Sequence, residues 1–121
     1  MKSLSKAEEQ VLYIIWTKEP TYLKDILASY PEPRPAKTTL ATVLKRIKDK
    51  GYITYDQEGK SRCYRSTVPK TKYLQHKITN LISRFFENSP TQFASFFTQE
   101  MELSEDEINQ IKDQINAQKD T

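Results

Sequence analysis

Residues 44–56 read LKRIKDKGYITYD, and this stretch decides the fold because it joins a basic helix to a strand. Its first half carries four cations at helical positions: Lys45, Arg46, Lys48 and Lys50. Gly51 follows them, and glycine commonly ends a helix because it adopts the left-handed conformation without a steric penalty. The residues after Gly51 are of types that favour a strand. The stretch therefore predicts a helix that runs straight into a β-hairpin.

The helix before Gly51 is predicted to span residues 37–50. Its apolar side chains have the i, i+3, i+4, i+7 spacing of a helix that buries one face: Leu40, Val43, Leu44 and Ile47. At about 100° per residue, the opposite face carries Thr38, Thr42, Lys45 and Asp49, with Arg46 at its edge. We therefore expect one side of this helix in the core and a hydroxylic, cationic side in solvent.

Two short strands are predicted after this helix, YITYD at 52–56 and RCYRSTV at 62–68. Gly59 lies between them, at a turn position where a Cβ is disfavoured. Alternation along the strands turns four side chains toward the core: Ile53, Tyr55, Tyr64 and Val68. Residues 53–68 therefore form a wing-like hairpin.

Two further helices are predicted before residue 37. Ser5 and Glu8 have the spacing of a capping box, which starts a helix that ends near Lys18. Thr21 is predicted to cap a second helix, which stops at YPEPRP because proline lacks an N–H and fixes φ. Helix, helix, helix, hairpin is the order of a winged helix-turn-helix, so the fold class is mainly α with a small β-hairpin.

Three more helices are predicted after Pro69, beginning at Thr71, at the Ser89–Pro90 pair and at the Ser104/Glu107 capping-box spacing. They carry more apolar surface than three short helices bury among themselves, so a second copy of the chain is expected to cover it. The alternative is a monomer in which this segment folds back on the winged helix. The predicted dimerisation residues are Leu74, Ile78, Leu81, Ile82, Phe85, Phe86, Phe93, Phe96, Phe97, Ile108, Ile111 and Ile115.

Charge is distributed unevenly along the chain. Residues 34–72 hold eleven lysines and arginines against three acids, whereas residues 98–121 hold seven acids against two lysines. A concentrated positive field attracts a polyanion, and the acidic end is better suited to face away from it. The basic segment contains both the 37–50 helix and the hairpin.

These features predict double-stranded DNA as a partner, with helix 37–50 in the major groove. Short side chains near its start let its backbone approach the base edges, and longer cations farther along reach phosphates. The hairpin tip can contact the adjacent backbone as a wing. The predicted DNA-binding residues are Thr38, Thr39, Ala41, Thr42, Lys45, Arg46, Lys60 and Arg62.

Two alternatives stand beside the DNA interpretation. A lysine-rich helix face is often only solvated surface. A winged helix can also serve as a protein-interaction module without sequence-specific DNA binding, and such a module favours acidic or apolar residues on the exposed face of this helix.

Composition excludes several other classes of protein. At 121 residues the chain has room for one domain, or for a small domain with an appended helical segment, and not for a large enzyme with a deep cleft. No apolar run approaches the roughly 20 residues of a membrane span, and MKSLSKAEEQ at residues 1–10 lacks the apolar stretch of a signal peptide, so we expect a cytoplasmic location and no direct membrane binding. Cys63 and His76 are the single cysteine and the single histidine. The sequence therefore predicts no disulfide, no metal site, no cofactor and no enzymatic activity.

The segments SKAEEQVLYIIWTKEPTYLKDI (5–26) and KTTLATVLKRIKDKGYITYDQEGKSRCYRSTV (37–68) resemble the penicillinase repressor family of bacterial transcription regulators, the BlaI/MecI/CopY group. The resemblance extends over nearly the whole chain. It implies a homodimeric transcriptional repressor that binds a palindromic operator. It also implies a winged-helix DNA-binding domain at residues 1–69 and a three-helix dimerisation region at residues 70–121.

The resemblance further implies a membrane-bound regulatory protease as a partner of the antibiotic-responsive members. In those members cleavage falls within the helix corresponding here to FASFFTQ (93–99), at an Asn-Phe bond, where this chain has Phe96–Phe97. The sequence therefore leaves cleavage open. The copper-responsive members carry a C-terminal cysteine cluster, which this sequence lacks, so copper sensing by that route is excluded.

Overall fold

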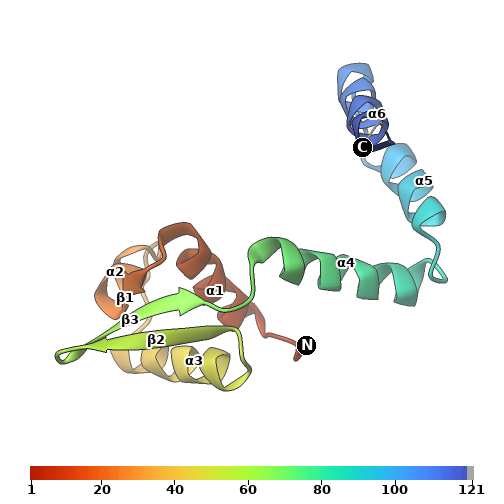
Figure 1. The fold of residues 1–121 in the computed structure, drawn as a ribbon. Helices are drawn as coiled ribbons and strands as arrows, with labels where there is room; N and C mark the ends of the chain where they lie inside the picture. The colour runs from red at the N-terminus through yellow and green to blue at the C-terminus, as the bar shows by residue number, and fades with distance from the viewer. Residues whose placement is uncertain (120–121) are drawn as a thin grey trace. The chain divides into compact units, whose positions relative to one another are not determined.

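The computed structural model describes residues 1–119 of the chain. The elements follow one another in the order drawn in Figure 1: α1 Lys6–Lys18, β1 Thr21–Tyr22, α2 Leu23–Ala28, α3 Lys37–Asp49, β2 Ile53–Glu58, β3 Ser61–Ser66, α4 Lys70–Phe85, α5 Pro90–Glu100 and α6 Glu105–Lys119. The predicted class, mainly α with a small β-hairpin in a winged helix-turn-helix, is confirmed.

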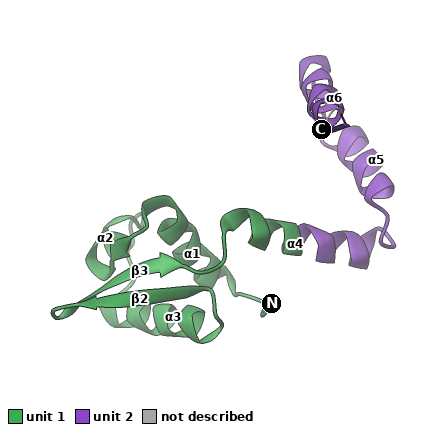
Figure 2. Cartoon of the chain, in the orientation of Figure 1, with its two compact units in different colours: residues 1–76 green, residues 77–121 purple. Residues whose placement is uncertain are grey.

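The chain divides into two compact units (Figure 2). Residues 1–76 form the first, called here the winged-helix unit, and residues 77–121 form the second, called the C-terminal unit. The division falls inside α4, so the first turns of that helix belong to the winged-helix unit. The predicted functional regions, 1–69 and 70–121, stay a prediction.

The core of the winged-helix unit lies where α1, α2 and α3 pack on one another and against the sheet. The α3 stripe behaves as its spacing predicts, because all four of its apolar residues are buried. Its main partners are Val11, Leu12 and Ile15 of α1 and Ile26 of α2, each fully buried. One side of α3 is thereby fixed against the protein, which leaves its other side exposed.

The sheet has three strands in the order β1-β3-β2, all antiparallel. The prediction that Thr21 caps α2 is wrong: Thr21 is buried in β1 opposite Tyr64, and no side chain caps the start of α2. Local spacing suggested a cap, but a place beside β3 satisfies the Thr21 backbone by pairing instead. β1 thus joins the loop before α2 to the hairpin.

The junction between α3 and β2 follows the predicted pattern. Lys50 is the C-cap of α3, and Gly51 has φ of +86°, a left-handed conformation that glycine adopts without strain. Tyr52, which follows, is fully buried. At the far end of the hairpin Gly59 has φ of +62°, so both glycines occupy positions that disfavour a Cβ.

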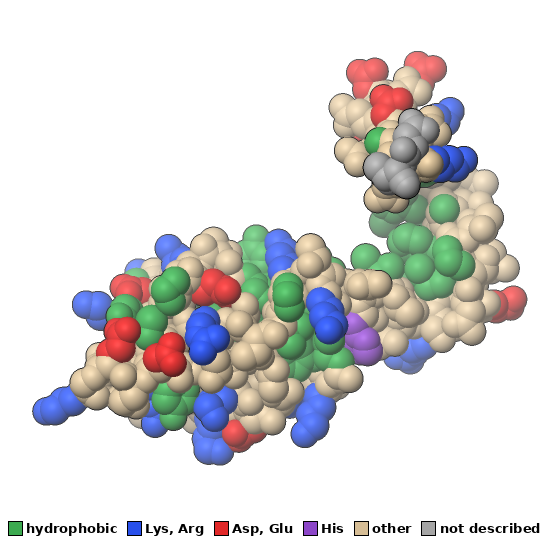
Figure 3. Space-filling model, in the orientation of Figure 1, with side chains coloured by type: hydrophobic (Ala, Val, Ile, Leu, Met, Phe, Trp, Pro, Cys, Tyr) green, Lys and Arg blue, Asp and Glu red, His purple; other side chains and the backbone are tan. Residues whose placement is uncertain are grey.

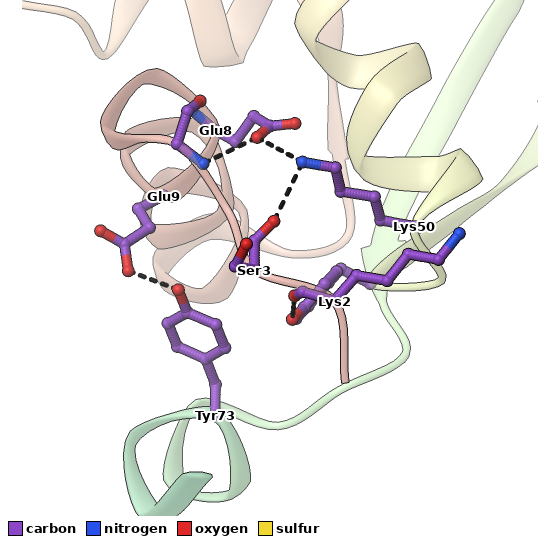
Figure 4. Close-up of polar contacts among 8 residues, drawn as sticks. Lys2, Ser3, Glu8, Glu9, Lys50 and Tyr73 are labelled. Atoms are coloured by element: carbon purple, nitrogen blue, oxygen red, sulfur yellow. Dashed lines mark hydrogen bonds and ion pairs between the residues drawn. The ribbon is translucent and has the colours of Figure 1, made fainter. Parts of the chain in front are cut away.

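A polar cluster ties the start of α1 to the end of α3 (Figure 4). The capping box of α1 is present, and its Glu8 carboxylate also accepts a hydrogen bond from Lys50 Nζ at 2.8 Å. Lys50 donates to the carbonyl of Ser3 as well, at 3.0 Å. Burial alone would raise the pKa of Glu8, but the bonds from Lys50 and the Ser5 backbone outweigh it and lower that pKa. Lys50 therefore supports the fold and is not part of the exposed cationic surface.

The first turns of α4 are anchored on the winged-helix unit by Tyr73. This side chain is buried, and its hydroxyl donates to the carboxylate of Glu9 (Figure 4). Its ring lies 5.7 Å from Trp16 and 5.6 Å from Tyr52, centroid to centroid. Burial and the Glu9 carboxylate raise the pKa of Tyr73. Trp16 in turn donates from Nε1 to the carbonyl of Val68 at 2.9 Å, so the link into α4 is held on both sides.

The C-terminal unit contains the last part of α4 and the predicted caps of the two helices that follow it. Ser89 caps α5 with Pro90 at its first turn, and Ser104 and Glu107 form both bonds of the predicted capping box before α6. Phe86 lies just beyond the end of α4 and places its ring 5.5 Å from Phe93 and from Phe96. The described residues of α5 and α6 include no buried side chain.

The predicted dimerisation residues all remain accessible to some degree in the single chain. Six are exposed (Leu74, Ile78, Leu81, Phe85, Phe96, Ile115), and six are half-buried (Ile82, Phe86, Phe93, Phe97, Ile108, Ile111). Figure 3 shows hydrophobic side chains gathered at the surface where α4 ends and α5 begins.

Neither a membrane-spanning helix nor a metal-binding cluster is present among residues 1–119. No helix there combines the length and the apolar character that a membrane crossing requires. No group of three or more His, Cys, Asp or Glu side chains in the same residues is arranged to hold a metal ion.

Candidate nucleic-acid interface

The exposed side of α3 presents its side chains in three rows, set by the helical spacing from the buried stripe. The outermost row carries Thr38, Thr42, Lys45 and Asp49. The row toward the hairpin carries Lys37, Ala41 and Lys48, and the row toward the proline-rich loop carries Thr39 and Arg46. All six predicted DNA-binding residues of this helix are exposed, together with their neighbours in these rows.

The hairpin projects past the helices with its tip free (Figure 1). Lys60 is in the turn and Arg62 in β3, and both are exposed. Figure 3 shows Lys and Arg side chains at this tip and along the edge of the unit where α3 lies. The predicted cations of helix and hairpin therefore belong to one region of the winged-helix unit.

A hydrogen bond fastens the tip of the hairpin to the start of α2. The hydroxyl of Tyr22 donates to the carboxylate of Glu58. This bond is the largest of several causes, with nearby Cys63 next, that raise the pKa of Tyr22 to about 12. Tyr22 lies in β1, which pairs with β3. The wing is thus braced by the short strand that the sequence did not reveal.

Open grooves lie between α3 and the hairpin. One is lined by Lys24, Lys37, Lys60 and Arg62 together with Tyr22 and Glu58. Another is lined by Lys45, Lys48 and Arg62, with Asp49, Ala41 and Tyr55 among its other walls. Arg62 and Ala41 line both grooves. A nucleic-acid backbone that ran alongside α3 would therefore meet cations from both α3 and the hairpin.

The cations of this region differ in whether an acid neutralises them. Lys45 Nζ lies 2.9 Å from Asp49, one turn along α3, and the Lys45 hydrogen bond lowers the pKa of Asp49. In residues 1–119, no carboxylate lies within ion-pair distance of Arg46, Lys60 or Arg62. These three side chains are therefore available to form ion pairs with an anionic partner.

Thr42 and Thr38 illustrate how the outermost row can meet base edges. The Thr42 hydroxyl donates to the carbonyl of Thr38 at 3.1 Å, one turn earlier. Its proton is thereby used within the helix, and the side chain, which still carries an acceptor oxygen and a methyl group, is exposed. Hydrogen-bond acceptors and methyls are groups that distinguish base pairs in the major groove.

Several side chains outside the predicted DNA-binding set line the same grooves. Lys24, Lys37 and Lys48 are exposed cations, and Tyr55 is a half-buried ring beneath them. Lys37 and Lys48 could have been found by extending the exposed arc of α3 toward the hairpin. Lys24 carries no such signal, because only the folded chain brings α2 beside the wing.

A helix with an exposed hydroxylic and cationic side, next to a basic hairpin, is the arrangement of winged-helix DNA-binding proteins. Comparison with known sequences narrows this class. Residues 4–117 match the penicillinase repressor family, and the chain belongs to this family. Its members are transcriptional repressors and not enzymes, which confirms the predicted family and the prediction of no enzymatic activity.

Individual relatives are similar to this chain over most of their length. The methicillin resistance regulatory protein MecI of Mammaliicoccus sciuri is 25% identical over 114 residues, which cover 93% of each chain. The penicillinase repressor of Bacillus licheniformis is 23% identical over 109 residues, which cover 89% of this chain and 85% of the relative. MecI of Staphylococcus aureus strain N315 is 25% identical over 114 residues, again 93% of each chain.

Proposed function

We propose that this protein is a homodimeric transcriptional repressor that binds a palindromic operator. α3 enters the major groove, and the hairpin of residues 53–68 contacts the adjacent backbone. The observation that carries the proposal is the exposed side of α3, which carries threonines near its start and lysines and an arginine farther along. Membership of the repressor family supports the same function.

The side chains of α3 divide by reach. Thr38, Ala41 and Thr42 are short, which allows the helix backbone to come close to base edges. Thr39, Lys45 and Arg46 lie around them, and the two cations are long enough to reach phosphates beside the groove. A protein-interaction module would favour acidic or apolar side chains here, so this surface supports DNA as the partner.

The hairpin supplies the second contact. Lys60 and Arg62 are exposed and lack an ion-pair partner in the described part of the chain. We propose that they contact the phosphates flanking the groove that α3 enters. Each such contact releases a counterion and adds to the salt dependence of binding.

The proposed dimer rests on an apolar row along α4, the helix that begins in the winged-helix unit and continues into the C-terminal unit. Leu74, Ile78, Leu81 and Phe85 recur at helical spacing along α4, and each is exposed by 41% or more. Such a row in water is unfavourable unless a second apolar surface covers it. We propose that the same row of a second copy covers it, because a twofold axis brings the same surface patch of the two copies into contact.

The test is a fluorescence-anisotropy titration of the protein against DNA from the promoter of its own operon, at two salt concentrations. Repression requires tight, sequence-dependent binding that weakens steeply with salt. Footprinting should then show two half-sites, separated centre to centre by about one helical turn of 10 to 10.5 base pairs or a multiple of it.

Two variants test the site assignment. Arg46→Ala should weaken binding to all sequences alike, because a phosphate contact is lost. It should also lower by about 0.9 the steepness with which the logarithm of the binding constant falls with the logarithm of salt concentration, called here the salt slope. Thr42→Val keeps the shape but removes the hydroxyl, so it should change the preference among sequences. Lys6→Ala on α1 removes the same charge outside this interface and serves as the control. Equal affinities of Arg46→Ala, Thr42→Val and the unmodified protein would refute the assignment.

A further inference from the structure

Tyr55 of β2 gathers two cations from different elements in the groove between α3 and the hairpin. Lys48 of α3 places its Nζ 5.6 Å from the centroid of the Tyr55 ring. Arg62 of β3 places its guanidinium carbon 4.5 Å from the same centroid. Both distances are within the range of about 6 Å at which a ring face attracts a cation.

The ring itself is held in place by the fold. Tyr55 stands directly opposite Tyr64 in the β2–β3 pairing, and the two ring centroids are 5.6 Å apart. Tyr64 is buried, and Tyr55 is half-buried against the hydrophobic core. A fixed ring restricts the rotamers of the two long side chains that lie on it, which lowers the entropy they lose on binding a ligand.

The charges of this pair are not neutralised within the chain. Among residues 1–119, neither Lys48 nor Arg62 has a carboxylate at ion-pair distance. Asp49, the acid that lines the groove, is engaged by Lys45. Two positioned cations facing an open groove constitute a binding surface for phosphodiesters, with Arg62 able to donate in bidentate fashion and Lys48 acting as a point charge.

We propose that Lys48 and Arg62 bind the phosphates of one DNA strand that passes between α3 and the hairpin, and that Tyr55 is the positioning residue for both. The inference rests on the proposed DNA-binding function. It assigns Lys48 to the DNA interface. It also links α3 to the hairpin through Tyr55, a side chain that does not itself contact DNA.

The experiment is a set of anisotropy titrations on the full chain with operator DNA over a range of salt concentrations. Lys48→Ala and Arg62→Ala should each reduce the salt slope by about 0.9. Tyr55→Leu should weaken binding about threefold to tenfold for all sequences, because two exposed cation–ring contacts are lost. Tyr55→Phe keeps the ring and should bind as the unmodified protein does.

The decisive comparison introduces Tyr55→Leu into the Lys48→Ala/Arg62→Ala protein. If Tyr55 acts through these two cations, it has no further effect on DNA affinity there. If Tyr55 has only a structural role, Tyr55→Leu should lower DNA affinity equally in both proteins, and that result would overturn the inference. Thermal melting shows whether Tyr55→Leu folds. If it does not, the Lys48→Ala and Arg62→Ala proteins carry the test, and an unchanged salt slope in both contradicts the inference.

The two proposals fail in different ways. If the unmodified protein does not bind operator DNA, the proposed function is wrong. If the unmodified protein binds with steep salt dependence and Tyr55→Leu has the same DNA affinity, only the positioning role of Tyr55 is wrong.

Discussion

Helices in both units carry an apolar face, but only the winged-helix unit buries its own. Val11, Leu12, Ile15 and Ile47 are fully buried there, whereas α5 and α6 contain no buried residue among those described. Three helices and a sheet can enclose a small core, whereas the apolar side chains of α5 and α6 stay at least partly accessible. The same sequence pattern therefore serves folding in the winged-helix unit and, in the proposed dimer, association in the C-terminal unit.

The largest expected effect tests the open region. Leu81→Asp places a charge in the exposed row of α4, where burial in a dimer would remove its water. We expect sedimentation equilibrium to show a monomer. We also expect operator affinity to fall by about 100-fold to 1,000-fold, because the two half-sites are no longer bound together. Ser83→Asp adds the same charge on another face of α4 and should leave the dimer intact. A Leu81→Asp protein that remains dimeric contradicts the proposed interface.

Truncation of the closed core is expected to have the next largest effect. Ile47→Ala removes a fully buried side chain and should lower the free energy of unfolding by about 2–5 kcal/mol. Ile47→Val should cost only about 0.5–1.5 kcal/mol, which makes it the graded control. Urea titration measures both.

The same truncation in the open region should cost far less when the dimer is absent. In the Leu81→Asp protein, Ile115→Ala removes a side chain that is 51% exposed and should cost less than about 1 kcal/mol. Equal costs for Ile47→Ala and Ile115→Ala in that background would break the comparison between the two units.

The third effect concerns the ion pair that closes the winged-helix unit. Lys50→Met deprives the buried Glu8 carboxylate of its cation and should cost about 1–3 kcal/mol near neutral pH. The pKa of Glu8 is lowered in the folded protein, so this stability is present above the ordinary value of 4.5 and is lost as the pH falls through the folded value. Urea titrations should therefore show the stabilities of the two proteins converging in acid. A difference that is independent of pH would contradict the role of the pair.

The smallest effect lies in the turn between α4 and α5. Glu87 has φ of +52°, a left-handed conformation that strains a residue with a Cβ. Glu87→Gly should raise the free energy of unfolding by about 0.5 kcal/mol, since relief of strain exceeds the added entropy of the unfolded chain. Thermal melting measures the gain, and Glu87→Ala, which keeps the Cβ, should not reproduce it.

Local patterns predicted the elements whose signals are complete within a few residues. The capping boxes at Ser5 and Ser104, the buried stripe of α3 and the turn at Gly51 all depend on spacing alone. The error at Thr21 has the opposite origin. A residue able to cap a helix was also able to pair with β3, and only the distant strand decided between the two.

The candidate site divides in the same way. The exposed row of α3 followed from the position of its buried stripe, because a rigid helix fixes each face relative to the others. The grouping of Lys48, Tyr55 and Arg62 did not follow, since it requires α3 and the hairpin to lie side by side. The role of Lys50 could not be predicted either. In sequence it is one of several neighbouring lysines, but in the fold its Nζ forms an ion pair with Glu8.

The sequence by itself determined the order of the elements, the side of α3 that faces the core and the concentration of positive charge in residues 34–72. These properties depend on helical and strand periodicity, which neighbouring residues specify. Tertiary structure alone decided which cations remain free, where the third strand pairs and which ring positions Lys48 and Arg62. Those outcomes depend on contacts between residues far apart in the chain, and such contacts form only when the core brings the elements together.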